Sequence, residues 1–470
     1  MTEDILQTVE TFLTYSDEKL AELSQKNQAL KLEVSDQENQ EGGKMKKYLL
    51  LLLMPILLAS ATVDSTEIDF ILTNQENFLL NARVTDETFT SVPSNPNVYS
   101  TVDTYLDRNL TQKVSTLKEN QTFSIQSVEI NDQNQQVFLL DNGQYLLADP
   151  AVIFDDQILE STTTQATVWL KKDFKLYTTP IGNKQKIAKT SLKAYQSVEI
   201  SEIVTTPTSI YAKIDGKGWL KSTDISQEDN RIEAVQELLN KKYSKDNIGV
   251  YVKQLSSQKT AGVNQDKMMY AASVTKLPVL YYVQEKIDQE EYSLTEGLQY
   301  IDKVTDFKGS YSAEGSGTLG KTADNRHYRI DELINKTAKE SDNAASNLLA
   351  YYITNQFDAT FYEEITAIVG QKWDMSSRQA SAQMAGMIME AIYHQSGYIL
   401  GSLQNTEFDN QRIARDIPVP VAHKIGDAYD FRHDVGVVYT DSPFILSIFT
   451  DQSDYDTISE IADDVYELLK

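Results

Sequence analysis

The chain contains no cysteine, which excludes disulfides, zinc–thiolate sites and thiol catalysis. Histidine is scarce as well: only four are present, and no two have the i, i+4 spacing of a helical metal site. They are His327, His394, His423 and His433. We therefore expect no metal centre, no cofactor and no Ser-His-Asp triad. Any nucleophile must be activated by a group other than histidine.

Positive charge is in deficit, because 69 Asp and Glu residues outnumber 43 Lys and Arg residues and give a formal net charge of -26. So negative a chain is repelled by nucleic acid, which we do not expect as a partner. The 470 residues, 41% of them hydrophobic, are too many for one hydrophobic core. The composition therefore predicts several domains.

One long apolar run lies near the start, but it is shorter than the roughly 20 residues that span a bilayer. Basic residues precede this leucine-rich run, and Ala59-Ser60-Ala61 ends it. Because this order is typical of an export signal, residues 45–61 are predicted to be a signal peptide or a membrane anchor. The chain after them is expected to be extracellular or at the cell surface. The acidic residues 1–44 are expected to be either an upstream frame joined to a product that starts at Met45 or a cytoplasmic tail.

Residues 98–225 are expected to be all β, because short apolar or alternating runs are separated by clusters of Asn, Asp, Gly and Thr. This region also repeats itself after about 75 residues. Residues 117–130 resemble 192–203, and residues 140–147 resemble 214–220. A nearly constant offset over two separate blocks indicates an internal duplication.

The duplication predicts two small barrels, at residues 98–155 and 166–225, after a strand-rich lead-in at residues 62–97. Each barrel is expected to be closed by a Gly turn and an aromatic plug, Tyr145 or Trp219. The Asp-Gly turn followed by Gly-Trp-Leu resembles the bacterial SH3-like domains of cell-wall proteins. The resemblance implies either cell-wall binding or a spacer without a ligand.

A Ser-x-x-Lys pair opens a predicted helix in the C-terminal half of the chain. From residue 229 onward helical and strand patterns mix, and this helix is expected to run to about Asp288. The spacing places Ser273 and Lys276 on one face of the helix. A serine hydroxyl needs a base to become a nucleophile, and a lysine in a dry, cation-rich pocket has a lowered pKa suited to that task.

Two further motifs follow. Ser341-Asp342-Asn343 opens a second helical run, and Lys424-Ile425-Gly426 lies at the start of a predicted strand. Ser-x-x-Lys, Ser-Asp-Asn and Lys-x-Gly in this order resemble the class A β-lactamases and penicillin-binding proteins. For residues 229–470 the resemblance implies an α+β fold, with an antiparallel sheet flanked by helices and an all-α subdomain. The whole chain is thus predicted to be multidomain.

The resemblance implies three catalytic residues. Ser273 would attack a carbonyl and become the acyl-enzyme, and Lys276 would accept its proton. Ser341 would pass a proton to the leaving amine.

Four substrate-binding residues are implied as well: Asn343, Lys424, Gly426 and Asp427. Asn343 would hold an amide side chain of the substrate, and Lys424 would supply positive charge to its carboxylate. The oxyanion would lie between the backbone N–H groups of Ser273 and Asp427, and such donors are each worth about 3–4 kcal/mol.

The chain departs from the family pattern at two places. No glutamate occurs between Gly370 and Met389, where a class A β-lactamase carries the base that activates the deacylating water. Hydrolysis of the acyl-enzyme is therefore expected to be slow. The hydroxyl residue that normally follows the strand lysine and helps to bind a substrate carboxylate is Ile425, so weaker carboxylate binding is expected. His423 and Arg432 are candidates for replacement donors.

The sequence thus favours an exported serine hydrolase that forms an acyl-enzyme at Ser273 with a β-lactam or a peptidoglycan-peptide amide, and that deacylates weakly. One alternative is a true β-lactamase that breaks down antibiotics. Another is a catalytically inactive protein that binds the cell wall through residues 98–225.

Overall fold

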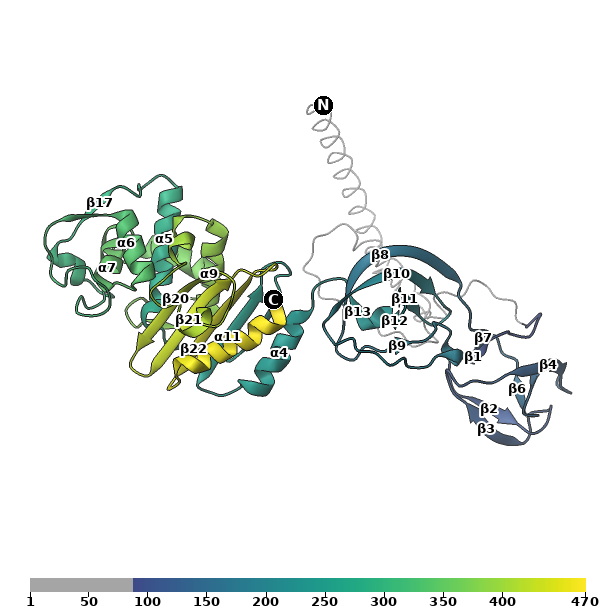
Figure 1. Cartoon of the computed structure of the whole chain (residues 1–470). Helices are drawn as coiled ribbons and strands as arrows, with labels where there is room; N and C mark the ends of the chain where they lie inside the picture. The colour runs from purple at the N-terminus through teal and green to yellow at the C-terminus, as the bar shows by residue number, and fades with distance from the viewer. Residues whose placement is uncertain (1–87) are drawn as a thin grey trace, which may run out of the picture. The chain divides into compact units, whose positions relative to one another are not determined.

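A computed structural model describes residues 88–470 of the chain (Figure 1). The predicted segments 1–44 and 45–61 and most of the lead-in at 62–97 lie outside the described residues. None of the helices within residues 88–470 is long and apolar enough to cross a membrane.

The first β-rich module has a five-stranded antiparallel sheet in the order β3-β2-β6-β5-β4. Phe138, Leu140 and Leu146 are buried in its core. Its strands are β1 (Pro96–Val98), β2 (Val102–Tyr105), β3 (Lys113–Leu117), β4 (Ile125–Ile130), β5 (Gln136–Leu140), β6 (Tyr145–Leu147) and β7 (Ile153–Asp155), of which β1 pairs with β7 outside the main sheet.

The second module has a six-stranded sheet in the order β13-β8-β10-β11-β12-β9. Its first strand begins at Glu160, ahead of residue 166, the predicted start of the second copy. The strands are β8 (Glu160–Leu170), β9 (Leu176–Tyr177), β10 (Ser197–Thr205), β11 (Ile210–Ile214), β12 (Gly218–Lys221) and β13 (Ile225–Ser226), with short 3-10 turns η2 (Gly182–Lys184) and η3 (Ser222–Asp224).

The duplication is visible in the two sheets, which share the orders β2-β6-β5-β4 and β9-β12-β11-β10. Equivalent hairpins turn at Gly143 and Gly216, where positive φ angles of 80° and 69° favour glycine. The prediction of an aromatic plug is wrong. Neighbouring residues on a strand point to opposite faces, and it is Leu146 and Leu220 that are buried, whereas the aromatic residue before each is partly exposed.

The C-terminal domain is built on a five-stranded antiparallel sheet in the order β15-β14-β22-β21-β20. Its faces contribute to two different hydrophobic cores, and adjacent residues such as Val250 and Tyr251 belong to opposite ones. The strands are β14 (Ile248–Gln254), β15 (Thr260–Val263), β20 (Val421–Ala428), β21 (Phe431–Val438) and β22 (Phe444–Asp451).

Helices cover both faces of this sheet (Figure 1). One face packs against α4 (Arg231–Lys242) and α11 (Tyr455–Leu469). The other face packs mainly against α9, which belongs to a group of helices. These helices and this face of the sheet together form the larger hydrophobic core. This group comprises α5 (Lys276–Asp288), α6 (Ile330–Lys339), α7 (Asn343–Tyr352), α8 (Ala359–Val369), α9 (Ala382–Gln395) and α10 (Tyr398–Ser402). The α+β fold predicted for the C-terminal half is thus confirmed.

Short elements carry the connections of this domain. Two small antiparallel pairs join β16 (Met269–Tyr270) to β19 (Gln379–Ala380) and β17 (Gly297–Gln299) to β18 (His327–Arg329). The 3-10 turns are η4 (Ala272–Thr275), η5 (Asp302–Thr305) and η6 (Arg412–Ala414). As a result, η4 at the start of α5, the start of α7 and the edge strand β20 all lie around one point.

Truncating the buried leucine of the second module tests its core. Leu220 is 0% exposed, so Leu220→Ala is expected to destabilise this module by about 2–5 kcal/mol. Ile187→Ala is the control, because Ile187 is 68% exposed and the loss there should stay within about 0.5 kcal/mol. Calorimetry of the full chain measures both. Equal unfolding profiles for the two variants would contradict the assigned core.

Candidate active site

The nucleophile segment is fixed on both sides of Ser273. The backbone N–H of Ala271 donates to the carbonyl of Arg378 over 2.8 Å. Ala272 has a φ of 49°, which is uncommon for a residue with a Cβ atom, and its carbonyl accepts a hydrogen bond from the Tyr311 hydroxyl at 3.0 Å. Ser273 follows in η4, directly before α5, with only 8% of its surface exposed.

Lys276 is fully buried beside this serine. Its Nζ lies 2.9 Å from Ser273 Oγ, 2.6 Å from the Ser341 carbonyl and 2.8 Å from Asn343 Oδ1. A neutral amine matches this set: its two protons go to the carbonyl and the amide oxygen, and its lone pair accepts the proton of the Ser273 hydroxyl. Among the described residues, Lys276 forms no ion pair that would hold it charged.

Electrostatics favour the neutral form of Lys276. Burial is the main reason that its pKa lies well below 10.5, and the positive charges of Lys424 and Arg378 lower it further. Asp342 opposes this effect. The short distance to Ser273 Oγ and the lowered pKa of Lys276 are the two features that a base for this serine needs.

Ser341 lies between two lysines. Its Oγ is 2.8 Å from Lys424 Nζ and 3.3 Å from Lys276 Nζ. Burial lowers the pKa of Lys424 to about 7, although Asp434 works in the opposite direction. Ser341 thus connects the amines of Lys424 and Lys276.

Asn343 is positioned at the first turn of α7. Asp342 caps this helix by accepting a hydrogen bond from the N–H of Ala345 at 2.9 Å. The Asn343 amide also donates to the Ser312 carbonyl at 2.9 Å. An NH₂ group has two protons, so one remains for a ligand.

The edge strand β20 runs close to the nucleophile segment. A Cβ atom on Gly426 would lie 2.6 Å from the Ala271 carbonyl oxygen, so only glycine allows this approach. The structure thus joins Ser273, Lys276, Ser341, Asn343 and Lys424 through hydrogen bonds, with Gly426 in contact beside them. The side chain of Asp427 does not join this network and binds Arg412 and Arg432 instead.

Neither candidate for a replacement donor is available. His423 is buried, with Nδ1 2.9 Å from Asp434 Oδ2 and Nε2 3.1 Å from Asp409 Oδ1. Burial alone would lower its pKa, but the two carboxylates outweigh burial and raise the pKa to about 9. Arg432 lies 3.3 Å from Asp427. Both side chains are engaged within the protein, so the hydroxyl missing at Ile425 is not replaced by them.

Sequence reasoning missed Tyr311 and Arg378. The Tyr311 ring centre is 4.5 Å from Lys276 Nζ, and the Arg378 guanidinium carbon is 4.0 Å from the same ring. Asn347 clamps the Tyr311 backbone with two hydrogen bonds of 2.7 Å. Neither residue belongs to a recognisable sequence motif. The only signal is an arginine in the shortened loop where the family carries its glutamate.

That loop, from α8 to β19, brings no carboxylate to the site. Trp373 and Met375 anchor it in the core, and Asp374 accepts a hydrogen bond from the N–H of Ser376 at 3.0 Å. Within residues 88–470, no carboxylate forms a hydrogen bond or an ion pair with Ser273 or Lys276.

A serine, a neutral lysine and a second serine on this α+β scaffold define a serine hydrolase of the acyl-transfer kind. Residues 230–469 match the β-lactamase enzyme family, and the chain belongs to that family. Residues 89–152 match a domain of unknown function, DUF5776, so the SH3-like resemblance stays a prediction. No curated protein matches the chain.

Solved structures that resemble the chain include PBP-A in an acyl-enzyme complex with penicillin-G and two β-lactamases. PBP-A is 18% identical, with a TM-score of 0.43, and the match covers 51% of this chain and 96% of PBP-A. The β-lactamase from Sphaerobacter thermophilus is 18% identical, with a TM-score of 0.42 over 52% and 96% of the two chains. The one from Francisella tularensis is 15% identical, with a TM-score of 0.40 over 51% and 98%.

Removing the charge of Arg378 tests the tuning of Lys276. In Arg378→Gln one of the positive charges that lower the Lys276 pKa is gone, so that pKa should rise. Acylation by a fluorescent penicillin, which requires the neutral amine, should then begin at a higher pH than in the wild type. Arg378→Lys keeps the charge and should retain the wild-type profile more closely. A shift to lower pH in Arg378→Gln would contradict the role assigned to Arg378.

The raised pKa of His423 predicts a pH-dependent stability. Its pKa is about 9 in the folded chain, against about 6.5 when unfolded, so its contribution is complete below the unfolded pKa and is lost as pH rises through about 9. His423→Gln should lower Tm most at about pH 6 and least at about pH 10. His394→Gln, at a more exposed histidine, is the control for the loss of an imidazole as such. A Tm loss for His423→Gln that does not change with pH would contradict the pairing.

Proposed function

We propose that this chain is an exported serine hydrolase that acylates Ser273 with a β-lactam or a peptidoglycan-peptide amide and releases the acyl group slowly. The observation that carries the proposal is the Ser341 hydroxyl held between two buried lysines, 2.8 Å and 3.3 Å from their amines. This arrangement supplies a base on one side of a substrate amide and a proton donor on the other.

Acylation starts with the neutral Lys276 amine. It takes the proton of Ser273 Oγ, which lies 2.9 Å away, as that oxygen attacks the carbonyl carbon. The negative charge moves to the carbonyl oxygen, where the backbone N–H groups of Ser273 and Asp427 are the assigned donors.

Breakdown of the tetrahedral intermediate needs a proton on the leaving nitrogen. Ser341 Oγ gives this proton as the C–N bond breaks. Ser341 is then reprotonated by the ammonium of Lys276 or by Lys424, since both lie within hydrogen-bonding reach. In either case Lys276 ends as a neutral amine, because a proton given by Lys424 is replaced from Lys276 through Ser341.

Slow deacylation follows from the surroundings of Lys276. An acyl-enzyme is hydrolysed when a base activates a water, and a carboxylate is the usual base in class A enzymes. Here the ring of Tyr311 lies next to Lys276, and the cation of Arg378 lies on that ring. The Tyr311 phenol does not accept a proton from water near neutral pH, because burial raises its pKa to about 12 and keeps it protonated.

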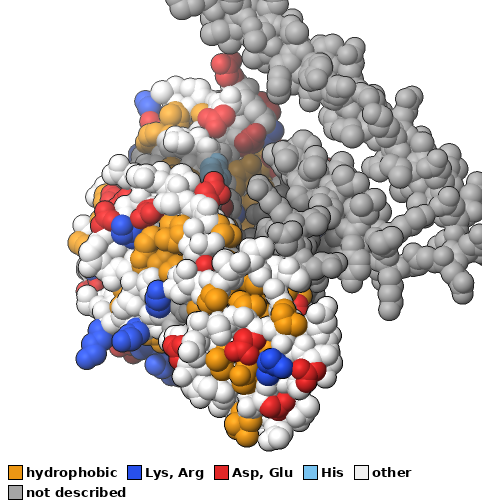
Figure 2. All heavy atoms as spheres, turned by 90° about the vertical axis from the view of Figure 1, so that its right-hand side faces the viewer, with side chains coloured by type: hydrophobic (Ala, Val, Ile, Leu, Met, Phe, Trp, Pro, Cys, Tyr) orange, Lys and Arg blue, Asp and Glu red, His pale blue; other side chains and the backbone are white. Residues whose placement is uncertain are grey.

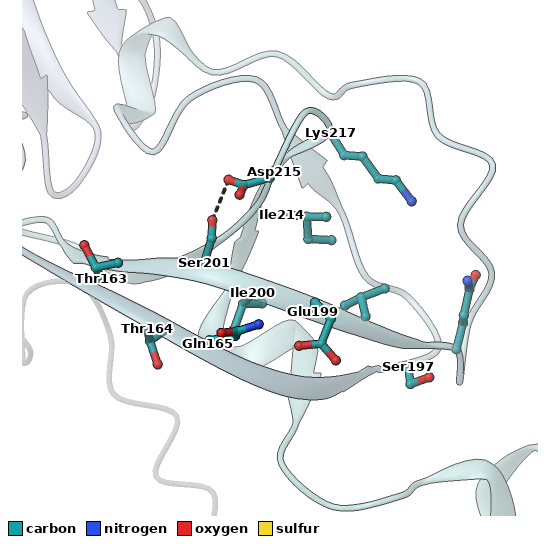
Figure 3. A pocket seen from close by; sticks show the side chains of 12 residues that line it. Thr163, Thr164, Gln165, Ser197, Glu199, Ile200, Ser201, Ile214, Asp215 and Lys217 are labelled. Atoms are coloured by element: carbon teal, nitrogen blue, oxygen red, sulfur yellow. Dashed lines mark hydrogen bonds between the residues drawn. The ribbon is translucent and has the colours of Figure 1, made fainter.

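The β-rich region favours a second, non-catalytic role in cell-wall binding. The second module has a groove of about 510 Å³ between β8, β10 and the β11–β12 hairpin (Figure 3). Glu199, Asp215 and Lys217 line it together with several hydroxyl and amide side chains. Ser201 Oγ donates to Asp215 at 2.6 Å, so part of this polar lining is already ordered. Such a surface suits glycan hydroxyls and peptide amides.

Most of the large exposed hydrophobic side chains also belong to residues 88–226. In Figure 2 hydrophobic side chains form separate patches between charged groups. Leu106, Leu159 and Ile187 are among the most exposed, at 57%, 59% and 68%. This distribution supports contacts with a surface through the β-rich modules.

A Ser273→Ala variant separates the catalytic and the binding roles. The wild type should become labelled by fluorescent penicillin and keep the label after excess drug is removed, whereas Ser273→Ala should stay unlabelled because the attacking oxygen is absent. Both should co-sediment equally with purified cell wall. Rapid turnover of a chromogenic cephalosporin would show a true β-lactamase instead. No labelling of the wild type, with wall binding intact, would favour the inactive wall-binding protein.

A further inference from the structure

Asp427 places a carboxylate on the face of β20 that also carries Ile425. The two residues are two positions apart, and side chains at that spacing point to the same face of a strand. Between them, Gly426 touches the Ala271 carbonyl just before the nucleophile. The carboxylate of Asp427 therefore lies at the end of the strand that passes Ser273.

Three side chains hold this carboxylate in place. Arg412 Nη2 donates to Asp427 Oδ2 over 2.6 Å, and Arg432 Nη1 lies 3.3 Å from Oδ1. The Tyr455 hydroxyl also donates to Oδ2. Arg412 is only 1% exposed and stacks on the Tyr455 ring at 3.9 Å. The carboxylate itself keeps 31% of its side chain exposed, so it is fixed yet reaches the solvent.

The pairing of Asp427 with Arg412 and Arg432 affects which substrates can bind at the end of β20, beside Ile425 and Asp427. The charges of Arg412 and Arg432 are directed at Asp427, and Ile425 offers no hydroxyl. The remaining cation is Lys424, whose ammonium already donates to Ser341 Oγ and to the Ile425 carbonyl. A substrate carboxylate brought here would have to compete with the resident one for Arg412 and Arg432, and would also meet its negative charge.

We propose that Asp427 is a specificity-determining residue that disfavours acyl donors with a carboxylate next to the scissile bond, so that a penicillin, which carries one, still acylates Ser273 but more slowly than a matched neutral donor. The preferred donors carry a neutral or an amine-bearing group there, as at an internal amide of a peptide rather than at its C-terminal residue. The inference rests on the proposed acyl transfer at Ser273 and refines its substrate class.

A matched pair of acyl donors tests this preference in the full chain. The donors are two thioesters with the same acyl group, whose leaving groups end in a carboxylate or in the corresponding carboxamide. The wild type should acylate Ser273 faster with the carboxamide. In Asp427→Asn the repulsion is removed and Arg412 becomes available, so the ratio of the two rate constants should shift toward the carboxylate donor by about tenfold or more.

Two further variants serve as controls for the effect of Asp427→Asn. Asp430→Asn removes a carboxylate from the neighbouring turn and should leave the ratio unchanged, which excludes an effect of net charge. Ile425→Thr restores a hydroxyl while Asp427 stays in place, and should gain less with the carboxylate donor than the Ile425→Thr/Asp427→Asn double variant. The wild type and Ile425→Thr both keep Asp427, so their preference for the carboxamide donor tests the proposal even if Asp427→Asn folds poorly.

The outcomes separate the role of Asp427 in specificity from acyl transfer at Ser273 itself. A wild type that acylates faster with the carboxylate donor, or an Asp427→Asn variant with an unchanged ratio, would overturn the role of Asp427 while leaving acyl transfer intact. Failure of both thioesters and of fluorescent penicillin to acylate Ser273 would overturn the proposed function, and this refinement with it.

Discussion

The buried amine of Lys276 determines how the catalytic domain is organised. An unpaired ammonium in the protein interior is too costly to keep, whereas a neutral amine needs only two acceptors and one donor. Two segments provide them: at the start of α7 the Ser341 carbonyl and Asn343 accept, and in η4 the Ser273 hydroxyl donates. Burial, helped by the positive charges of Lys424 and Arg378, favours the neutral amine. The hydrogen bonds of Lys276 Nζ therefore hold the start of α5 and the start of α7 together.

The edge strand β20 contributes Lys424 and Gly426 to the site. It brings Lys424 to Ser341, and Gly426 lets the backbone approach the nucleophile segment. The same strand turns Asp427 toward Arg412, which ties the cleft to η6 and to the first residue of α11. One strand therefore carries a lysine that reaches Ser341 and, three residues later, a carboxylate held by two arginines.

Much of the catalytic fold and the residues of the central network could be predicted from the sequence, because three short motifs in a fixed order identify them. The remaining features depend on contacts that no local pattern encodes. Tyr311 reaches Lys276 from a loop without a motif, and Arg378 reaches Tyr311 from a segment recognised only by the glutamate it lacks.

Local patterns also misled in the β-rich modules. The constant spacing of the duplication correctly predicts equivalent hairpins, but the prediction that the aromatic residues Tyr145 and Trp219 fill the core is wrong. Strand alternation assigns that position to the leucine that follows each of them. The ion pairs of His423 with Asp434 and Asp409 likewise could not be predicted from the sequence. They depend on the pairing register of β20 and β21, which decides which side chains are neighbours.

The protonation state of Lys276 is the most direct test of this account. A pH titration by NMR of the chain with isotope-labelled lysine side chains, with the Lys276 signal assigned by its loss in Lys276→Arg, measures the pKa of this amine in the resting protein. The account predicts a pKa well below 10.5. A pKa at or above 10.5 would mean that Lys276 stays charged near neutral pH, and it would contradict the assignment of this lysine as the base for Ser273.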